Sequence, residues 1–548
     1  MAPSKSYQRK SIQFLMSPLI LVVFLSCLTL YTVECANILI ICPTPSYSHQ
    51  IPFIVIGKDL VRRGHTVTMI GTDPLKEPPT NFTQVDLSFS YKYFKPQLRT
   101  GEKVEHTMEN QKKNTAYDFS RNVAQISTVY TEDQLKSDQM QKFLRHIDEN
   151  KVTFDLIIYE ALLHTAYLGF LPKLGYPPLI SMTTINPTCS FGIHSGSLVC
   201  NPSYLPEILS GYTGTMSLVQ RIDNLMLLLY TTYWLKPRVL KEQDALMEKY
   251  FHTSGIRGED LVENYTLLML STSWLLTYPR PTLPNTILLG PIHLEDARPL
   301  PQELQQWMDG AKDGVIYFSL GSNMQSASLD EDKRKAILYS FRQFPNHRFL
   351  WKWETDVLPD LPPNVMCRKW MPQRDILAHP KVKLFITQGG LQSSQEAIHF
   401  GVPMIGIPYI ADQQTNVRKL EEMGIARYLE PDYDITPHTL VEAIKSTLFN
   451  STVQQKIEFY SKLSNMDMMP PLDLAYYWIE YVLKAKGNVD HLKVNLNGFP
   501  WYQYYLVDIA GIFVLLVVVV LCLVFFIFKF ILKLCCSRKT VAKKMKKR

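Results

Sequence analysis

The clearest indication of the fold is one segment, Lys383-Leu-Phe-Ile-Thr387-Gln388-Gly389-Gly390-Leu391-Gln392-Ser393-Ser394-Gln395-Glu396. Its first five residues, with Leu-Phe-Ile at their centre, are typical of a buried strand, and two glycines then lead into a predicted helix. Free backbone N–H groups and the positive end of that helix would face an anion, which suits a phosphate. Glu396, about one and a half turns into the helix, can accept hydrogen bonds from a vicinal diol such as a ribose.

Strands and helices alternate on both sides of this stretch. In the same half we expect strands at Gly314–Ser319, Phe349–Lys352 and Pro403–Ile407, and a helix at Asp330–Phe344. In the N-terminal half we expect strands at Asn37–Cys42, Thr66–Ile70, Phe154–Tyr159 and Leu179–Met182, with a helix over Ile51–Arg63 between the first two. This alternation predicts α/β structure with parallel sheets covered on both faces.

Prolines cluster between Tyr278 and Pro301, which predicts a linker at 279–301. The linker would separate an N-terminal domain, 36–278, from a C-terminal domain, 302–490, whose last helices return toward the first domain. Two doubly wound units imply a cleft where the carboxyl ends of both sheets can meet a ligand.

Composition sets the broad class of the protein. A chain of 548 residues suits two or three domains, and a hydrophobic content of 46% excludes wholesale disorder. The formal net charge of +7 lies at the ends: 529–548 holds nine Lys or Arg and no acid, and 1–35 adds a net charge of +2. The body is left with about −4, so we expect no nucleic-acid partner.

The two ends predict a membrane protein. The basic start and apolar run of 1–35 are typical of a secretory signal peptide, although a retained membrane anchor is the alternative. The segment 507–528 is predicted to form one transmembrane helix, because Ile509–Phe528 contains no charge. Aromatic residues precede it and the basic tail 529–548 follows it, which predicts a single-pass type I protein with a lumenal body and a cytosolic tail.

Weaker signals agree with a lumenal body. Asn81, Asn264 and Asn450 each begin a glycosylation sequon. The final Lys544-Met-Lys-Lys-Arg548 is similar to a dilysine signal for retrieval to the endoplasmic reticulum, with a plain stop-transfer tail as the alternative. Cys189 and Cys200 could pair, but four lumenal cysteines make no disulfide framework and no zinc spacing.

The sequence from Trp370 through Gln413 resembles the signature of the UDP-glycosyltransferases. The resemblance extends over nearly the whole chain, including Gly64-His65-Thr-Val-Thr and Phe318-Ser-Leu-Gly-Ser322, and the Gln-Gly-Gly sequence with the lysine-rich tail is most similar to insect members. It implies the two-domain GT-B fold, two Rossmann-like doubly wound domains that face a cleft. The N-terminal domain would bind the acceptor and the C-terminal domain the UDP-sugar.

The resemblance also assigns donor-binding residues. Trp370 would stack on uracil, Gln373 would bond the nucleoside and Glu396 the ribose. Asp412 and Gln413 would bind the sugar hydroxyls. The family often has His at position 388, where Gln388 has no positive charge in any state. The diphosphate would be lined by Ser319, Ser322, Gln388 and Ser393, next to the Gly389-Gly390 turn, and Gly321 and Gln392 are further donor-binding residues.

The family keeps its catalytic base at the position of His49, in the loop expected after the first strand. The partner acid follows the pattern Phe-Asp-x-x-x-x-Asp, which here is Phe154-Asp155-Leu-Ile-Ile-Tyr-Glu160. Glu160 would orient His49 and stabilise the imidazolium, while Asp155 would be structural. A lone loop histidine is otherwise most often ordinary surface, and Trp370 taken alone is more often a core aromatic.

The function implied is inverting, metal-independent transfer of a hexose from a UDP-sugar to hydroxyls of small lipophilic acceptors, a detoxification-type conjugation. UDP-glucose would be a co-substrate, and no cofactor or metal site is expected. A glucuronate donor carries a carboxylate that would need a cationic partner. The resemblance places that cation two residues before Ser273-Trp274, where this chain has the neutral Ser271, and Arg280 is the nearest substitute. Glucose is therefore favoured over glucuronate. The alternatives are a UDP-glucuronosyltransferase and a catalytically weak UDP-sugar-binding membrane protein. Homo- or hetero-oligomers stay open.

Overall fold

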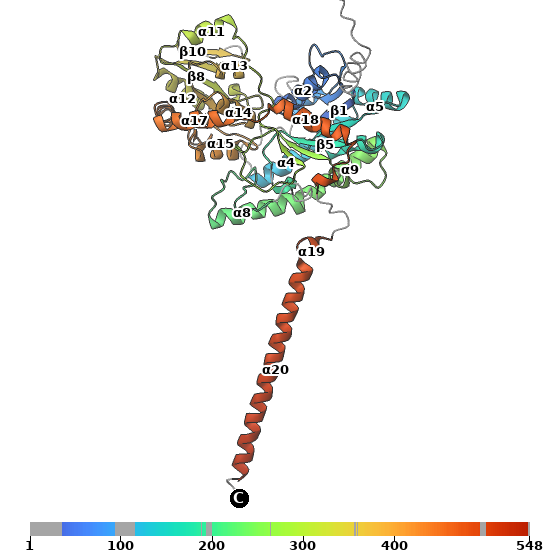
Figure 1. The fold of residues 1–548 in the computed structure, drawn as a ribbon. Coiled ribbons are helices and arrows are strands. Elements are labelled where there is room, and N and C mark those ends of the chain that lie inside the picture. Colours follow the sequence, from blue (N-terminus) through green and yellow to red (C-terminus); the bar gives the residue numbers. More distant parts are fainter. Residues whose placement is uncertain are drawn as a thin grey trace, which may run out of the picture. The chain divides into compact units, whose positions relative to one another are not determined.

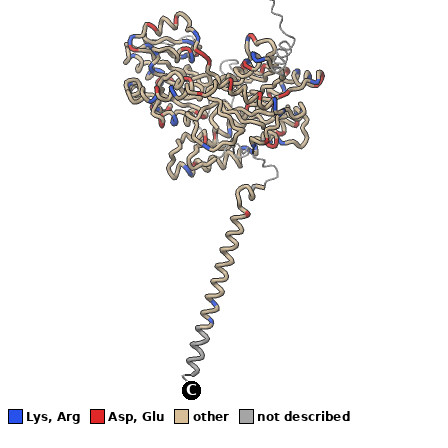
Figure 2. The backbone as a smooth tube through the Cα atoms, in the orientation of Figure 1, with Lys and Arg blue, Asp and Glu red and all other residues tan. Residues whose placement is uncertain are grey.

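The computed structural model describes residues 35–93, 115–187, 189–192, 200–263, 265–355, 358, 360–493 and 500–545. The predicted signal peptide lies almost wholly outside the described residues, as do Asn264 and the last three residues of the tail. The described residues up to Lys493 form one compact unit, and those from Pro500 onward belong to a second. Basic and acidic residues are interspersed along the chain of the first unit (Figure 2).

The first sheet is parallel throughout and has seven strands. In spatial order they are β3 (Phe82–Asp86), β2 (Thr66–Gly71), β1 (Asn37–Cys42), β4 (Leu156–Glu160), β5 (Leu179–Thr183), β6 (Leu267–Leu270) and β7 (Thr286–Leu288). The order reverses between β1 and β4, so their carboxyl ends flank a topological switch point, where such sheets bind ligands.

The second sheet repeats this plan with six parallel strands. In spatial order they are β10 (Val365–Arg368), β9 (Arg348–Lys352), β8 (Val315–Ser319), β11 (Val382–Thr387), β12 (Met404–Gly406) and β13 (Ala426–Tyr428). Its switch point lies between β8 and β11. The prediction of two doubly wound α/β units is confirmed.

Helices cover both faces of both sheets (Figure 1). The main helices of the first half are α2 (Tyr47–Arg62), α4 (Ala116–Leu135), α5 (Asp138–Asn150), α8 (Leu218–Leu229), α9 (Lys236–Phe251) and α10 (Gly258–Glu263). Those of the second half are α11 (Gln302–Asp309), α12 (Glu331–Arg342), α13 (Gln373–Leu377), α14 (Leu391–His399), α15 (Gln413–Glu422), α16 (Pro437–Leu448), α17 (Ser451–Ser464) and α18 (Pro471–Lys484). Two short helices, α6 (Phe170–Lys173) and α7 (Cys189–Gly192), lie in the first half, and Cys189 and Cys200 form a disulfide.

The period of two along each strand divides the buried side chains between two cores. In β1, Leu39 and Ile41 contribute to one core, whereas Ile38 and Ile40 contribute to the other. The first core is completed from α4, α5 and α9, and the second from α2 and α18. Helix α18 therefore completes the N-terminal sheet although it follows the whole C-terminal sheet in sequence (Figure 1).

The structure corrects the expected linker at 279–301. Thr286–Leu288 is not irregular but forms β7, the edge strand paired with β6. The prolines at 281 and 284 precede this strand, and an apolar run of three residues is too short to stand out between them. The N-terminal sheet therefore extends to Leu288.

The second unit contains α19 (Trp501–Tyr504) and α20 (Val507–Met545). Within α20, Val507–Leu534 is long and apolar enough to cross a membrane, and it is the one such helix among the residues described. This segment includes the predicted span 507–528.

We predict that α18 stabilises the N-terminal sheet. Ile479 is fully buried on α18, while Tyr477 on the same helix is 51% exposed. Replacing Ile479 with Ala leaves a cavity and should lower the free energy of unfolding by about 2–5 kcal/mol. Tyr477→Ala, the matched control, should cost less than about 1 kcal/mol. Urea denaturation of the detergent-solubilised chain, followed by tryptophan fluorescence, measures both, and equal effects would contradict the assignment.

Candidate active site

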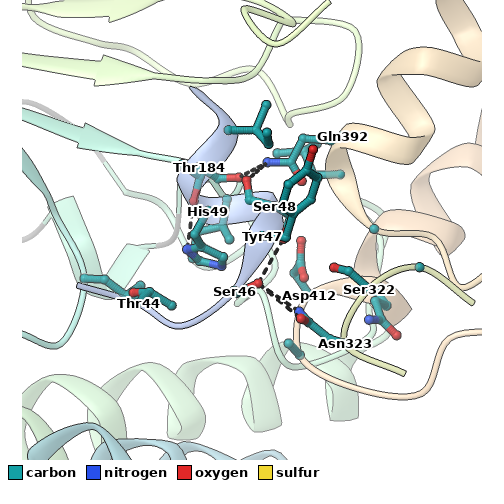
Figure 3. Close-up of a pocket in the computed structure, with 18 of the residues that line it drawn as sticks. Thr44, Ser46, Tyr47, Ser48, His49, Thr184, Ser322, Asn323, Gln392 and Asp412 are labelled. Atoms are coloured by element: carbon teal, nitrogen blue, oxygen red, sulfur yellow. Dashed lines mark hydrogen bonds between the residues drawn. The ribbon is translucent and has the colours of Figure 1, made fainter. Parts of the chain in front are cut away.

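The two switch points open onto one cavity of about 830 Å³. Its lining includes His49 and Thr184 from the N-terminal half and Ser322 and Asp412 from the C-terminal half (Figure 3). Gly321 and Glu396 line it as well. A cavity of this size lies within the range that holds small-molecule ligands.

His49 and Glu160 form a hydrogen-bonded pair at the N-terminal switch point. His49 Nδ1 lies 2.6 Å from Glu160 Oε1 and 3.0 Å from Thr184 Oγ1. Glu160 is the last residue of β4 and is 1% exposed, whereas the His49 side chain is 17% exposed and lines the cavity. The pairing of Nδ1 leaves Nε2 as the ring nitrogen available to a ligand.

The environment of Glu160 favours its ionised form. Burial alone would raise its pKa, but the charge of His49 and the hydrogen bonds from His49 and Thr44 outweigh burial and hold the pKa below its usual range. A carboxylate in this position can stabilise a positive charge on the His49 ring. Asp155, the other acid of the motif, accepts a hydrogen bond of 2.7 Å from the backbone N–H of Asn37 at the edge of β1.

His49 lies in the first turn of α2 and not in a preceding loop, which corrects the expectation from sequence. The helix begins at Tyr47, four residues before the predicted start at Ile51. The apolar spacing starts only at Ile51, because the first turn of α2 faces the cavity with polar residues. The helical turn fixes the direction of the His49 side chain.

Gly321 and Gln388 meet where the two central strands of the C-terminal sheet end. Gly321 has a φ of +78°, and a Cβ atom there would lie 2.1 Å from Gln388 Nε2. Only glycine fits this conformation and this contact. Ser319 Oγ accepts a hydrogen bond of 3.2 Å from Gly321 N–H, and Ser322 lines the cavity beside them.

The glycine pair exposes the N-terminus of α14. Gly389 has a φ of +82°, and a Cβ atom there would lie 2.1 Å from Val417 Cγ2. Gly390 is the N-cap residue of α14, and no side chain caps the helix. The first backbone N–H groups of α14 therefore stay available to an anion in the cavity.

Gln373, Ser393 and Glu396 form one hydrogen-bonded group. Gln373 Nε2 donates to Ser393 Oγ at 3.0 Å and to Glu396 Oε2 at 2.7 Å. Trp370 is 61% exposed, which excludes a core role, and its ring meets the edge of Tyr47 at a centroid distance of 5.7 Å. A flat aromatic face and an oriented carboxylate lie on the same side of the cavity.

Asp412 and Gln413 each use one side-chain oxygen in a hydrogen bond within the protein. Asp412 Oδ2 accepts from Asn416 Nδ2 at 2.7 Å, and Gln413 Oε1 accepts from the backbone N–H of Tyr409 at 2.9 Å. Burial raises the pKa of Asp412, although Asn416 and the nearby charge of His49 oppose the shift. Asp412 and His49 both line the cavity (Figure 3).

Hydrogen bonds join the two halves across the cavity. Gln392 Nε2 donates to the backbone oxygen of Ser48 at 2.9 Å, and Asn323 Nδ2 lies 3.0 Å from Ser46 Oγ (Figure 3). Gln392, predicted as a donor-binding residue, lines the cavity, and its amide nitrogen donates to the residue before His49. The C-terminal half thereby holds the first turn of α2.

Sequence reasoning missed several basic side chains of the cavity, among them Lys352 and His293. Lys352, the last residue of β9, donates to the Gly321 carbonyl oxygen and lies 3.6 Å from Glu354, and burial lowers its pKa. A lysine that ends an apolar strand was the available signal. His293 lies 3.6 Å from Glu396 and is buried in the cavity wall. Its position inside the proline-rich segment concealed it.

The part of the cavity next to α2, α4 and α9 is mainly apolar. Its lining there includes Ile54, Val55, Phe119, Val123, Leu227 and Val239. From the sequence we also expect Phe191–Cys200 and Tyr212–Leu229 to line or cover the acceptor pocket. Leu227 lines this part of the cavity, whereas 193–199 lie outside the described residues.

Comparison with known proteins is consistent with this geometry. Residues 37–547 match the family model described as UDP-glucoronosyl and UDP-glucosyl transferase. The chain is 32% identical to UDP-glycosyltransferase UGT5 of Dactylopius coccus, over 91% of this chain and 93% of that protein. It is 28% identical to human UDP-glucuronosyltransferase 2B7, over 87% of this chain and 90% of that protein.

Solved structures show the same fold. A UDP-glucose: anthocyanidin 3-O-glucosyltransferase in complex with UDP has a TM-score of 0.55 at 15% identity, covering 82% of this chain and 99% of that chain. The glycotransferase of kitacinnamycin gives a TM-score of 0.55 at 19% identity, covering 82% of this chain and 100% of that chain. The predicted GT-B fold is confirmed, and the chain belongs to the UDP-glucuronosyl and UDP-glucosyl transferase family, whose members are glycosyltransferases that use UDP-sugars.

Proposed function

We propose that this enzyme transfers glucose from UDP-glucose to hydroxyl groups of small lipophilic acceptors, with inversion at the anomeric carbon. The observation that supports this most strongly is the His49 and Glu160 pair, which opens onto the same cavity as the uncapped N-terminus of α14. A base and an anion-binding site in one cavity suit an attack that expels a diphosphate.

In the proposed reaction, His49 Nε2 accepts the proton of the acceptor hydroxyl as its oxygen attacks the anomeric carbon. Glu160 stabilises the imidazolium through Nδ1–H. The bond from the sugar to UDP breaks on the opposite face, and UDP leaves with the bonding electron pair. Backbone N–H groups at Gly389 and Gly390 and the end of α14 stabilise the diphosphate, so we propose that no divalent ion takes part.

The donor would lie along the C-terminal side of the cavity. Trp370 would stack on the uracil, and Glu396, held by Gln373, would accept hydrogen bonds from the ribose. Lys352 would add a positive charge near the diphosphate that Gln388 does not supply. Asp412 and the amide nitrogen of Gln413 would bind the sugar hydroxyls.

The charges around the proposed sugar position favour a neutral hexose. Ser271 is fully buried and uncharged, and Arg280 is buried beside Glu207 and does not belong to the described lining of the cavity. Asp412 is proposed to bind the sugar hydroxyls and, when ionised, would repel the carboxylate of a glucuronate. The apolar lining near α2 and α4 supports a lipophilic acceptor.

We also propose that the enzyme is a type I protein of the endoplasmic reticulum membrane that conjugates foreign compounds in the lumen. The support is the helix Val507–Leu534, the basic tail and the predicted signal peptide. Asn81 and Asn450 are both exposed, as glycosylation would require. Asn450 Oδ1 caps α17 by accepting from Thr452 N–H at 2.9 Å, which leaves its nitrogen for a glycan.

Removing the base should abolish turnover while leaving the donor bound. We expect His49→Ala and Glu160→Gln to lower kcat at least about 100-fold, because the first lacks the base and the second cannot stabilise the imidazolium. Asp155→Asn keeps its acceptor for Asn37 and is the matched control, with activity within about threefold of wild type. Steady-state kinetics with UDP-glucose and a phenol, together with UDP calorimetry, measure these effects. An active His49→Ala enzyme would refute the mechanism.

Changes at the nucleotide side should act on donor affinity. Trp370→Ala and Glu396→Gln should raise the KM for UDP-glucose about tenfold or more, since each removes a contact to the nucleoside. Tyr339→Ala, an exposed aromatic on α12 outside the cavity lining described here, is the control and should leave the KM unchanged. If Trp370→Ala and Glu396→Gln both keep the wild-type KM for UDP-glucose, the assignment of the nucleotide site is wrong.

Donor preference tests the argument from charge. We expect kcat/KM for UDP-glucose to exceed that for UDP-glucuronate at least about tenfold, because Asp412, one of the two residues proposed to bind the sugar, would repel the added carboxylate. Direct competition of the two donors for one phenolic acceptor, with both products counted, measures the ratio. Asp412→Asn should lower the ratio of kcat/KM for UDP-glucose to that for UDP-glucuronate, because it removes the repulsion between Asp412 and the glucuronate carboxylate. Equal use of both donors would instead support a glucuronosyltransferase.

A further inference from the structure

A chain of buried polar groups lies behind Glu160, away from His49. Thr44 Oγ1 lies 2.6 Å from Glu160 Oε2, and His164 Nε2 lies 3.0 Å from Thr44 Oγ1. On the far side of the ring, His164 Nδ1 lies 3.2 Å from Thr131 Oγ1. Thr44 is 4% exposed, and His164 and Thr131 are fully buried.

The number of protons fixes the direction of every hydrogen bond in this chain. The Glu160 carboxylate can only accept, so the single hydroxyl proton of Thr44 points to Glu160. The Thr44 oxygen must then accept from His164 Nε2–H, which leaves Nδ1 of His164 to accept from Thr131. On the other side of Glu160, His49 donates from Nδ1, and its Nε2 remains unprotonated and ready to accept a proton.

His164 stays neutral, so this pattern persists at physiological pH. Burial lowers the pKa of His164 to about 4, although the charge of Glu160 opposes the shift. Tyr130 OH lies 2.9 Å from the same Nε2 atom, so the N–H of His164 points toward two oxygen atoms.

The longer side chain of Glu160, compared with Asp, explains why hydrogen bonds through Thr44 and His164 are needed. Glu160 occupies a position that the family pattern gives to Asp, and its extra methylene adds one freely rotating bond. Each added bond increases the number of orientations that the carboxylate can adopt. A donor on Oε2 removes that freedom, because it fixes one oxygen while His49 engages the other.

We propose that Thr44 and His164 are positioning residues that hold the Glu160 carboxylate in the orientation required by His49. This inference rests on the proposed function of His49 as the base. Neither residue needs to touch the substrate to act in this way.

The interpretation of the pH dependence of activity depends on which titratable groups surround His49 and Glu160. Burial raises the pKa of Cys42, Tyr130 and Tyr159, so these groups are uncharged near neutral pH. Asp412 also interacts electrostatically with His49, and His164 is neutral. A change in the acidic limb of the activity profile after removal of a donor to Glu160 therefore reports on the His49 and Glu160 pair.

Thr44→Val tests the proposal because it removes the hydroxyl and keeps the shape. A carboxylate without this donor attracts the imidazolium proton more strongly, so the midpoint of the acidic limb should rise by about one pH unit. We expect kcat to fall about 10- to 100-fold, with the KM for UDP-glucose within twofold. Thr44→Ser retains the hydroxyl and should restore the wild-type midpoint.

His164 is tested by a similar pair of variants. His164→Leu removes the N–H that orients Thr44 and should shift the midpoint in the same direction, with a loss in kcat of about 3- to 30-fold. His164→Gln places an amide N–H near the position of Nε2 and should recover most of the activity. Thr266→Val and His65→Leu, buried changes in the same sheet away from the cavity, control for general destabilisation and should leave the midpoint unchanged.

A second readout separates this inference from the proposed function. Diethyl pyrocarbonate modifies unprotonated imidazole, so the pH dependence of His49 modification, followed by mass spectrometry of its peptide, gives the midpoint without any sugar transfer. If wild type transfers no sugar while Thr44→Val still shifts this midpoint upward, the proposed function fails and the positioning role stands. If folded Thr44→Val and His164→Leu both keep the wild-type midpoint and kcat within twofold, the inference is wrong.

Discussion

The parallel pairing of β1 with β4 is the constraint on which the site depends. Ile41 lies beside Tyr159 in this pairing, so the chain leaves both strands at the same level of the sheet. Glu160 therefore faces the start of α2, where His49 lies, across a short distance. A shift of one residue in this register would turn Glu160 to the other face of the sheet and leave a buried carboxylate without its partners. Ser319 and Thr387 are paired in the same way in the second sheet.

The site handles a charged substrate mainly with dipoles. Backbone N–H groups at the start of α14 and side-chain amides face the cavity, while the buried Lys352 is already bonded to Gly321 and close to Glu354. Fixed dipoles in a partly dry cavity stabilise a diphosphate without the cost of burying further unpaired charges. They also depend on exact backbone conformation, which is why positions 321 and 389 require glycine. Binding of the nucleotide therefore depends directly on the backbone conformation at these two glycines.

Much of this arrangement could be predicted from the sequence, because it depends on local patterns. Apolar runs gave the strands near 37–42 and 382–387 to within a residue, and the resemblance to a family pointed to His49 and Glu160. The start of α2 was placed four residues late, since polar residues that face a cavity do not show the apolar spacing of a helix. Strand β7 was missed because three apolar residues among prolines give little signal. The contact of Lys352 with Gly321, and that of Gln392 with Ser48, depend on tertiary packing between distant segments and have no counterpart in sequence spacing.

The return of α18 to the N-terminal sheet links folding to synthesis. One face of that sheet receives Ala475, Ile479 and Val482, which follow β1 by more than 400 residues. A chain that is made from its N-terminus cannot cover this face until almost the whole body has emerged, so its apolar surface stays open for most of translation. The N-terminal half is then a client for chaperones during this interval, and truncation before α18 would leave it without a complete core. The two halves of this enzyme contain separate sheets, but the N-terminal half completes its core only after the C-terminal half has been synthesised.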